Sequence, residues 1–211
     1  MIELTDITFH YAEHCILDIP QWSVSQGEHV FIHGSSGCGK STLLNIISGL
    51  LQPTTGQITV AGQALHLLSS RQRDRFRAKS VGYVFQQFNL IPYLSAYHNL
   101  TLASRFFKTR VKTASQMLSA LNISPQDQAR PVRQLSIGQQ QRVAIARSLI
   151  NQPAILIADE PTSSLDHTNQ KNFMNLLFDV MQDTTLVFVS HDLSLAHYFT
   201  RVVPFDRINT R

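Results

Sequence analysis

A glycine-rich loop at residues 34–41 constrains the fold of this chain more than any other feature of the sequence. The loop reads Gly-Ser-Ser-Gly-Cys-Gly-Lys-Ser and matches G-x-x-x-x-G-K-[ST] at every fixed position. An apolar stretch at residues 30–32 precedes it, and a helical apolar pattern over residues 40–51 follows it. Strand, loop and helix in this order place backbone N–H groups and a positive helix end around phosphate oxygens. The loop therefore predicts a phosphate-binding site.

Two side chains of this loop have chemistry suited to a nucleotide. Lys40 supplies a mobile positive charge for the β- and γ-phosphates, and the Ser41 hydroxyl can bind Mg²⁺. The other candidate binding residues of the loop are Gly34, Ser35, Ser36, Gly37, Cys38 and Gly39. Cys38 lies beside a helix N-terminus, which favours a thiolate, although a small space-filling role is the more common one for such a cysteine.

Two adjacent carboxylates form the second chemical signal. Asp159 and Glu160 follow an apolar strand pattern at residues 155–158. Asp159 can hold Mg²⁺ through water, and Glu160 can orient or deprotonate an attacking water. His191 follows a second buried strand pattern, so it should lie at the same edge of a parallel sheet, where ligands bind. Each residue alone has a plain structural alternative, but their pairing with the phosphate loop favours catalysis.

Apolar strand patterns alternate with helical patterns along most of the chain. The expected strands are residues 2–9, 16–24, 28–32, 57–60, 81–85, 154–158 and 185–189, and the expected helices are residues 40–51, 69–79 and 168–181. Residues 95–149 are mostly helical, with Ser95 and Ser124 as helix starts and Asp192 as the cap of a last helix. This order predicts an α/β fold with a mostly parallel sheet and an inserted helical region.

Composition indicates which kinds of partner and which cell compartment suit this chain. The chain has 211 residues and a formal net charge of +4, and residues 29–126 hold ten Lys and Arg residues against one acid. This regional charge favours an anionic partner. Two cysteines cannot form a disulfide framework, which suits a reducing compartment. Because no apolar run approaches the roughly 18 residues needed to cross a bilayer, any membrane role must come through a partner.

The chain resembles the ATP-binding subunit of ABC transporters over nearly its whole length. Six elements occur in the family's order: residues 34–42 (Walker A), Gln86 (Q-loop), residues 135–139 (signature), residues 155–160 (Walker B), residues 163–166 (D-loop) and His191 (switch histidine). The resemblance implies a P-loop NTPase (RecA-like) core with an N-terminal antiparallel β subdomain and an inserted α-helical subdomain. Residues 1–86 and 153–211 would form the core with the β subdomain, and residues 87–152 the helical subdomain of a single cassette.

The resemblance also implies a role for each matching residue. Tyr11 would stack on adenine, and Thr42 would join Lys40 and Ser41 in holding the phosphates and Mg²⁺ of bound ATP. Gln86 would contact Mg²⁺ and the attacking water, and His191 would contact the γ-phosphate. Ser136 and Gly138 are expected to close over the ATP of an opposing subunit, and Gln139 and Asp166 are further expected nucleotide-binding residues. Two copies would therefore sandwich two ATP molecules as a head-to-tail homodimer.

One position departs from the family pattern. Ile137 stands in the signature where the family usually has glycine. A β-branched side chain disfavours positive φ and adds bulk beside the opposing nucleotide. Since Ser136, Gly138 and Gln139 are retained, ATP-driven closure is expected to survive in a weakened form.

The expected partner is a transmembrane permease that docks near residues 86–97, which include an apolar loop-like stretch at residues 88–93. The chain would then be cytoplasmic and peripheral on the inner face of the membrane. Residues 84–92 and 139–147 look most like the lipoprotein-release and macrolide-export (LolD/MacB) branch, which points to export or envelope work. The basic run at residues 71–79 is either a solvated helix face or a contact for anionic lipid or an acidic partner loop.

Two alternatives belong to other classes. A soluble ABC-type ATPase acting on nucleic acid or ribosomes usually carries two cassettes or long insertions, and 211 residues leave room for neither. No nucleic-acid partner is therefore expected. A non-hydrolysing nucleotide-binding module is suggested only by Ile137, and the presence of Glu160 and His191 argues against it.

Overall fold

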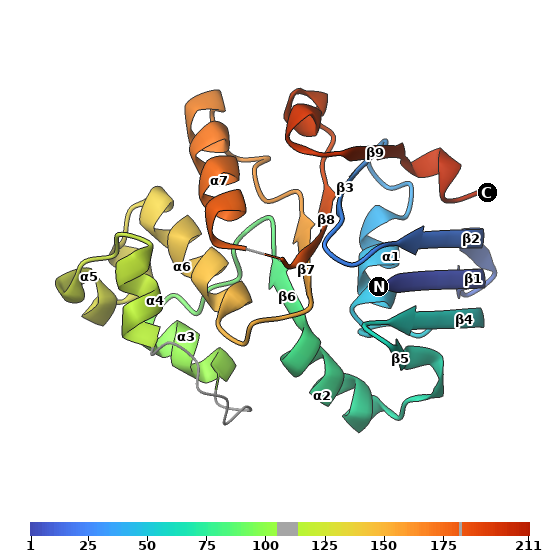
Figure 1. The fold of residues 1–211 in the computed structure, drawn as a ribbon, viewed down its shortest axis with the longest axis horizontal. Coiled ribbons are helices and arrows are strands. Elements are labelled where there is room, and N and C mark those ends of the chain that lie inside the picture. Colours follow the sequence, from blue (N-terminus) through green and yellow to red (C-terminus); the bar gives the residue numbers. More distant parts are fainter. Residues whose placement is uncertain (105–113, 182) are drawn as a thin grey trace.

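A computed structural model describes residues 1–104, 114–181 and 183–211 of the chain. In these residues, a four-stranded antiparallel sheet and a five-stranded parallel sheet lie beside a group of helices (Figure 1). The mixed α/β fold with an N-terminal antiparallel sheet, a parallel core and inserted helices is confirmed. None of the helices in the described part of the chain is long and apolar enough to cross a membrane.

The antiparallel sheet has the strand order β2-β1-β4-β5. Its strands are β1 (Ile2–Tyr11), β2 (His14–Val24), β4 (Thr55–Val60) and β5 (Gln63–Ala64). The buried residues of β1 include Ile2, Leu4 and Ile7, and the side chains between them are mostly exposed. This pattern is typical of a sheet with one face in the core and one in solvent.

The parallel sheet has the strand order β6-β7-β8-β3-β9, and every neighbouring pair is parallel. Its strands are β3 (His29–His33), β6 (Val81–Val84), β7 (Ile155–Asp159), β8 (Thr185–Val189) and β9 (Arg201–Pro204). All five residues of β8 are buried, as expected for a strand covered on both faces. Because the strands are parallel, the loops that follow β3, β7 and β8 leave from the same edge of the sheet.

Helices cover the parallel sheet on opposite faces. Helix α1 (Lys40–Ile47) shares one hydrophobic core with both sheets, through residues such as Leu43 and Ile46. Helices α6 (Ile137–Leu149) and α7 (His167–Val180) share a second core, which contains Phe31 and Phe188 of the sheet. Successive residues of β3 thus point to different cores, which fixes the register of the central strand.

The remaining helices form a layer next to α6 with a core of its own. They are α3 (Ala96–Ser104), α4 (Ala114–Ala120) and α5 (Pro125–Ala129). Leu100, Leu118 and Val143 are among the buried residues that hold this layer together. Helix α2 (Ser70–Ser80) lies apart from it and leads directly into β6 (Figure 1). Four short 3₁₀ segments complete the described part: Leu65–Leu67, Val132–Gln134, Leu193–Tyr198 and Phe205–Arg207.

Most expected elements are confirmed, with two differences. The helix expected over residues 40–51 ends at Ile47, because Gly49 takes a left-handed φ of 72° and its N–H bonds to the Ile46 carbonyl. The last helix is a 3₁₀ segment, although Asp192 does accept a bond from the Ser194 N–H at 3.0 Å. The helix starts at Ser95 and Ser124 are as expected, since each hydroxyl accepts a bond from a backbone N–H three residues later.

Candidate nucleotide-binding site

The glycine-rich loop joins β3 to α1 and turns sharply at two glycines. Gly37 and Gly39 have φ angles of 78° and 109°, in the left-handed region that a side chain disfavours. A Cβ atom at Gly39 would also lie 3.0 Å from a methyl group of Leu17 in β2. The loop therefore needs glycine both for its turn and for its close approach to the antiparallel sheet.

Lys40 is held inside this loop. It is 6% exposed, and its Nζ lies 3.0 Å from the Gly34 carbonyl oxygen and 2.7 Å from that of Ser35. A buried ammonium needs such partners, because desolvating an unpaired charge is costly. The Cys38 sulfur lies 3.8 Å from the same nitrogen, so the thiol faces the Lys40 ammonium. Ser35, Ser36 and Ser41 are exposed and Thr42 is half-buried.

Asp159 ends β7 next to the start of α1. Burial raises the pKa of Asp159, and the charge of Glu160 acts in the same direction. The nearby hydroxyls of Ser41 and Tyr83 act in the opposite direction and lower this pKa, as does the charge of Lys40. The partly buried Asp159 carboxylate therefore lies close to the Ser41 hydroxyl, which the sequence predicts to bind Mg²⁺, and to the Lys40 ammonium, which it predicts to bind phosphate.

Glu160 and His191 leave the same edge of the sheet and meet. Glu160 has a left-handed φ of 45°, and its N–H donates to the Val189 carbonyl at 2.9 Å. Its Oε2 lies 3.2 Å from Nδ1 of His191. A residue with a side chain rarely adopts this φ, and such residues cluster at functional sites. The parallel pairing of β7 with β8 thus brings together two residues 31 positions apart.

Two other candidates lie in exposed positions. Gln86 follows β6 and is exposed, with no hydrogen bond to a residue in the described ranges. Tyr11 is 53% exposed and contacts Phe9 edge-on, with 4.9 Å between ring centroids. It ends β1 at the hairpin turn, where Ala12 has a φ of 52°. Both side chains are accessible to a ligand, and neither touches the Glu160–His191 pair.

The signature residues lie at the start of α6, and their side chains form hydrogen bonds within that same helix. The Ser136 hydroxyl accepts a bond from the Gln139 N–H at 3.2 Å, and the Gln139 side chain accepts one from the Ser136 N–H at 2.9 Å. Ile137 is 65% exposed and is the first residue of the helix. A Cβ atom at Gly138 would meet nothing within 4 Å. The fold of this chain therefore does not itself require glycine at position 138.

The structure corrects one expectation about Ile137. It is not among the described residues with positive φ, so the conformational argument against a β-branched residue fails. The solvent-exposed bulk of Ile137 is therefore the one remaining reason to expect weaker closure over an opposing nucleotide. Asp166 also caps its own helix: it accepts a bond from the Asn169 N–H at 2.8 Å, and this bond lowers the pKa of Asp166. In the described part of the chain, neither Ser136 nor Asp166 contacts the glycine-rich loop.

The sequence reasoning missed two features of the site. Tyr83 lies on β6 beside Asp159, and burial, with help from that carboxylate, raises the pKa of its hydroxyl. The alternation of β6 gave a weak signal for it. The C-terminal segment also reaches the loop: a Cβ atom at Gly34 would lie 3.0 Å from the Cβ of Phe205. The loop and this segment together line a pocket of about 440 Å³. Cys38, Asn209 and Arg211 are among its lining residues.

The arrangement of loop, strand ends and helices agrees with known proteins. The family model "ABC transporter" matches residues 17–163. The chain belongs to this family. This cassette therefore binds and hydrolyses ATP, and it is an ATP-binding subunit of the kind that dimerises and works with a transmembrane permease.

Three comparisons show how close the relatives are. The lipoprotein-releasing system ATP-binding protein LolD of Bacteroides fragilis is 36% identical, over 96% of each chain. The spermidine/putrescine import ATP-binding protein PotA of Legionella pneumophila is 40% identical over 98% of this chain and 57% of that protein. The structure of the cassette MJ0796 of Methanocaldococcus jannaschii, described as a dimeric post-hydrolysis state bound to ADP and Pi, has a TM-score of 0.85 at 35% identity. That match covers 97% of this chain and 94% of the other.

Proposed function

We propose that the cassette hydrolyses ATP at a site built by the glycine-rich loop and the ends of β7 and β8. The observation that carries the proposal is the Glu160–His191 contact at 3.2 Å, at the sheet edge where Lys40 and Asp159 also lie. Lys40 and Thr42 hold the phosphates, and Tyr11 stacks on adenine. The loop backbone from Gly34 to Gly39 supplies N–H groups to the phosphate oxygens.

In this proposal Glu160 orients and deprotonates the attacking water. His191 keeps the carboxylate in place from Nδ1 and presents the rest of its ring to the γ-phosphate. Gln86, exposed at the end of β6, contacts the same water. The left-handed backbone at Glu160 separates its side chain from that of Asp159, so the two adjacent acids serve different purposes.

The donor set at Asp159 suits Mg²⁺. A carboxylate beside the Ser41 hydroxyl offers hard oxygen ligands, and magnesium is usually held by one or two such groups together with substrate phosphates. We assign Ser41, Asp159 and Gln86 to the ion. When bound, Mg²⁺ would neutralise charge that develops on the β- and γ-phosphate oxygens. Bound Mg²⁺ would also stabilise the ionised form of Asp159, because a cation offsets the cost of ionising a buried carboxyl.

The second half of each site comes from another copy of the cassette. Ser136, Gly138 and Gln139 start α6 without touching the loop of their own chain, and the open space at Gly138 suits a ligand from a partner. We propose a head-to-tail homodimer in which these residues and Asp166 close over the opposing ATP. In this assignment residues 1–86 and 153–211 form the ATPase core and residues 87–152 the helical subdomain.

We assign the permease contact to residues 86–97 and the hollow beside them. Tyr93 and Tyr97 are 70% and 41% exposed. A pocket of about 310 Å³ is lined by Phe85, which directly precedes this segment, together with Ala103 and Arg147. This contact would keep the chain cytoplasmic, on the inner face of the membrane. Phe88 is buried. The Arg147 guanidinium donates to the carbonyls of residues 88 and 89 and so holds the backbone of this segment against α6.

We favour the export and envelope branch over import. The match to LolD spans 96% of both chains, whereas the match to PotA spans 57% of that protein. Co-purification from membranes, followed by identification of the associated subunit, tests this branch. A permease of an import system in the purified complex would overturn it.

Dimer formation by Glu160→Gln tests the ATPase proposal. This variant keeps the binding residues but lacks the base, so ATP is expected to trap a dimer that light scattering detects, with hydrolysis reduced about 100-fold or more. Lys40→Ala is the matched control: it is expected to form no dimer, because it loses the charge that binds phosphate. A Glu160→Gln protein that stays monomeric in ATP would contradict the head-to-tail site.

A further inference from the structure

Helix α2 carries five basic residues, and two of them serve the fold of the chain itself. The Arg73 guanidinium donates to the Leu68 carbonyl at 2.8 Å and to the Ser70 hydroxyl at 3.3 Å. Arg77 donates to the Gly49 carbonyl at 2.8 Å and forms an ion pair with Asp74. The folding of α2 against the rest of the chain accounts for both cations.

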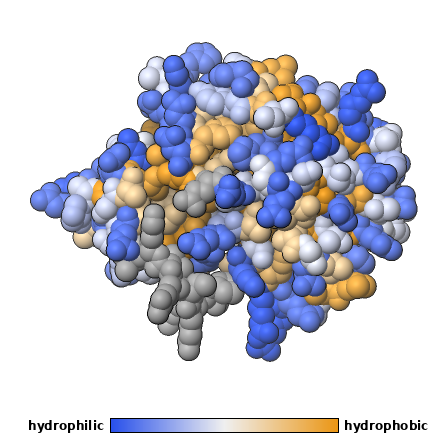
Figure 2. Space-filling model, viewed as in Figure 1, coloured by the Kyte–Doolittle hydropathy of each residue, from blue (hydrophilic) through white to orange (hydrophobic). Residues whose placement is uncertain are grey.

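The other three basic residues have no such role. Arg71, Arg75 and Lys79 are exposed, and their side chains make no hydrogen bond or ion pair with a residue in the described ranges. They are spaced four residues apart, so they form a row along one side of α2, about 6 Å from one to the next. Figure 2 shows hydrophilic side chains protruding along the lower edge of the molecule, where α2 lies.

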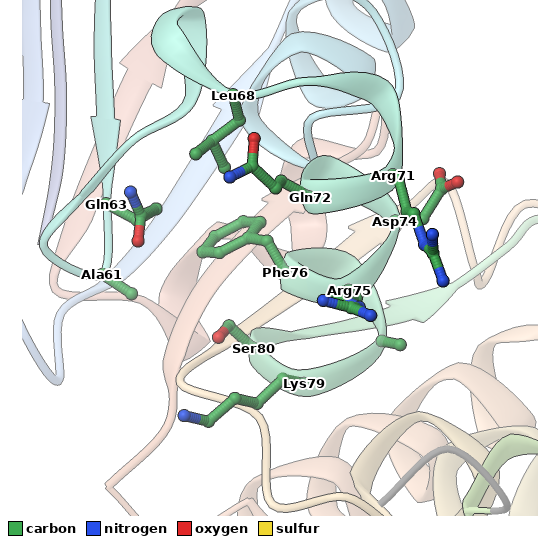
Figure 3. Close-up of a pocket in the computed structure, with 11 residues that line it drawn as sticks. Ala61, Gln63, Leu68, Arg71, Gln72, Asp74, Arg75, Phe76, Lys79 and Ser80 are labelled. Carbon is green, nitrogen blue, oxygen red and sulfur yellow. The ribbon is translucent and has the colours of Figure 1, made fainter.

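All three cations border a single groove with an apolar floor. The groove measures about 1010 Å³ and lies between α2 and the turn from β4 to β5. In Figure 3, Phe76 points from α2 toward Ala61 on that turn and Gln63 of β5, with Leu68 above it. The amides of Gln63 and Gln72 add hydrogen-bonding groups to the wall. Phe76 is 9% exposed, so the apolar surface is recessed below the charged rim.

We propose that this groove binds a short acidic segment of a partner protein. Carboxylates on the segment would meet Arg71, Arg75 and Lys79, and an apolar side chain between them would pack on Phe76. A recessed floor favours a peptide over a lipid surface, because a flat membrane would reach the rim cations but not the floor. None of these residues belongs to the nucleotide site or to residues 86–97, so the inference stands apart from the proposed function.

The probe for this inference is a helical peptide of about twelve residues with glutamate at every fourth position and leucine between them, so that its repeat matches the cation row. Binding to the full chain is measured by fluorescence anisotropy. The comparison peptide has the same composition with its glutamates distributed around the helix. The repeat peptide is expected to bind about tenfold more tightly, because only it presents all its charges on one side.

Two charge-reversal variants make the test specific. Arg71→Glu/Arg75→Glu alters the rim, and Arg133→Glu/Lys171→Glu is the matched control, with the same change in net charge at exposed positions elsewhere. The rim variant is expected to lose about tenfold in peptide affinity, with basal ATPase activity unchanged, while the control variant binds as the original chain does.

Three results would overturn the inference. Equal losses in both variants would show attraction to net charge alone. If the repeat peptide does not bind, the row of Arg71, Arg75 and Lys79 is only a solvated helix face. Binding to vesicles of phosphatidylglycerol and phosphatidylcholine that depends on Arg71 and Arg75, with no peptide binding, would assign the groove to a membrane surface instead.

Discussion

At the scale of single residues, burial acts on two charged groups of the candidate nucleotide site, the Lys40 ammonium and the Asp159 carboxylate. Lys40 is 6% exposed and satisfies its ammonium with two carbonyl oxygens of its own loop. Burial raises the pKa of Asp159, so its ionised form is also disfavoured without a cation. Both charges are better satisfied when phosphate and a metal ion are present, which couples ligand binding to the stability of the site.

Ile137 allows a residue-scale prediction about the signature. Ile137→Gly and Ile137→Ala both remove an exposed side chain at the helix start, where the backbone is already helical. Because bulk alone opposes closure, both substitutions are expected to raise the ATPase rate at a fixed protein concentration, by about two- to tenfold. A gain in the glycine variant without one in the alanine variant would show that backbone freedom matters after all.

His29 gives a prediction about pH. It starts β3 against Phe178, with 5.3 Å between ring centroids, and burial lowers its pKa. The unfolded chain therefore takes up a proton near pH 6.5 that the folded chain resists. The contribution of neutral His29 to the free energy of unfolding is therefore fully present above that pH and is lost as the pH falls below it.

The measurement is the midpoint of thermal unfolding, Tm, between pH 7.5 and about pH 5. The original chain is expected to lose Tm across this range, and His29→Leu is expected to lose less because it removes the proton site. His14→Gln, at an exposed position, is the control and should follow the original chain. An identical Tm loss in His29→Leu would assign the pH dependence to other groups.

At the scale of elements, the last residues of the chain support the glycine-rich loop from outside. Asn209 is buried, accepts a bond from the Asp18 N–H at 2.7 Å and donates to the Ile16 carbonyl at 3.1 Å. Ile16 and its neighbour in β2 in turn contact the position of Gly39. With the close approach of Phe205 to Gly34, two contacts connect this segment to the loop.

Asn209→Ala is expected to weaken both folding and ATP binding. It removes two hydrogen bonds and leaves the partners on β2 unpaired, which costs about 2 to 3 kcal/mol in the free energy of unfolding. Denaturant titration measures this loss, and titration with a fluorescent ATP analogue measures affinity. Thr210→Val is the matched control, since it removes only an exposed bond to the Asp18 carbonyl. Lower stability with unchanged affinity would show that the segment does not position the loop.

At the scale of the whole molecule, the two halves of the proposed nucleotide site lie at separate places in the fold. The glycine-rich loop and α1 lie on one face of the parallel sheet, while α6, which carries the signature, lies on the other (Figure 1). One chain therefore does not bring its own signature onto its own phosphates. The proposed symmetric dimer would provide two complete sites at once.

Mixing two inactive variants tests this division. Lys40→Ala lacks phosphate binding, and Gly138→Asp places a charge where its own chain leaves open space. Each alone is expected to be inactive. An equal mixture is expected to recover up to about a quarter of the original ATPase activity, since half of the dimers then hold one intact composite site. A mixture as inactive as its components would contradict the shared site.

The candidate residues could be read from the sequence because their signals are local. The spacing of Gly34 to Ser41 is short enough to show a phosphate loop, and Asp159 and Glu160 directly follow an apolar strand. Tyr83 has only a weak local signal and Asn209 has none, because their contacts join residues far apart in the chain. Asn209 reaches Asp18 across 191 positions, and no local pattern encodes such a pair.

The sequence by itself determined the chemistry available to this protein: which residues have the groups and spacing suited to phosphate, which acids follow the strands, and that the chain resembles an ATP-binding cassette. Only the tertiary structure decided which residues meet. It paired Glu160 with His191, separated the signature from the loop, and divided the five cations of α2 into two that hold the fold and three that border a groove. The physical reason is that residue type fixes charge and hydrogen-bonding capacity, whereas packing decides which groups are buried, satisfied or left for a partner.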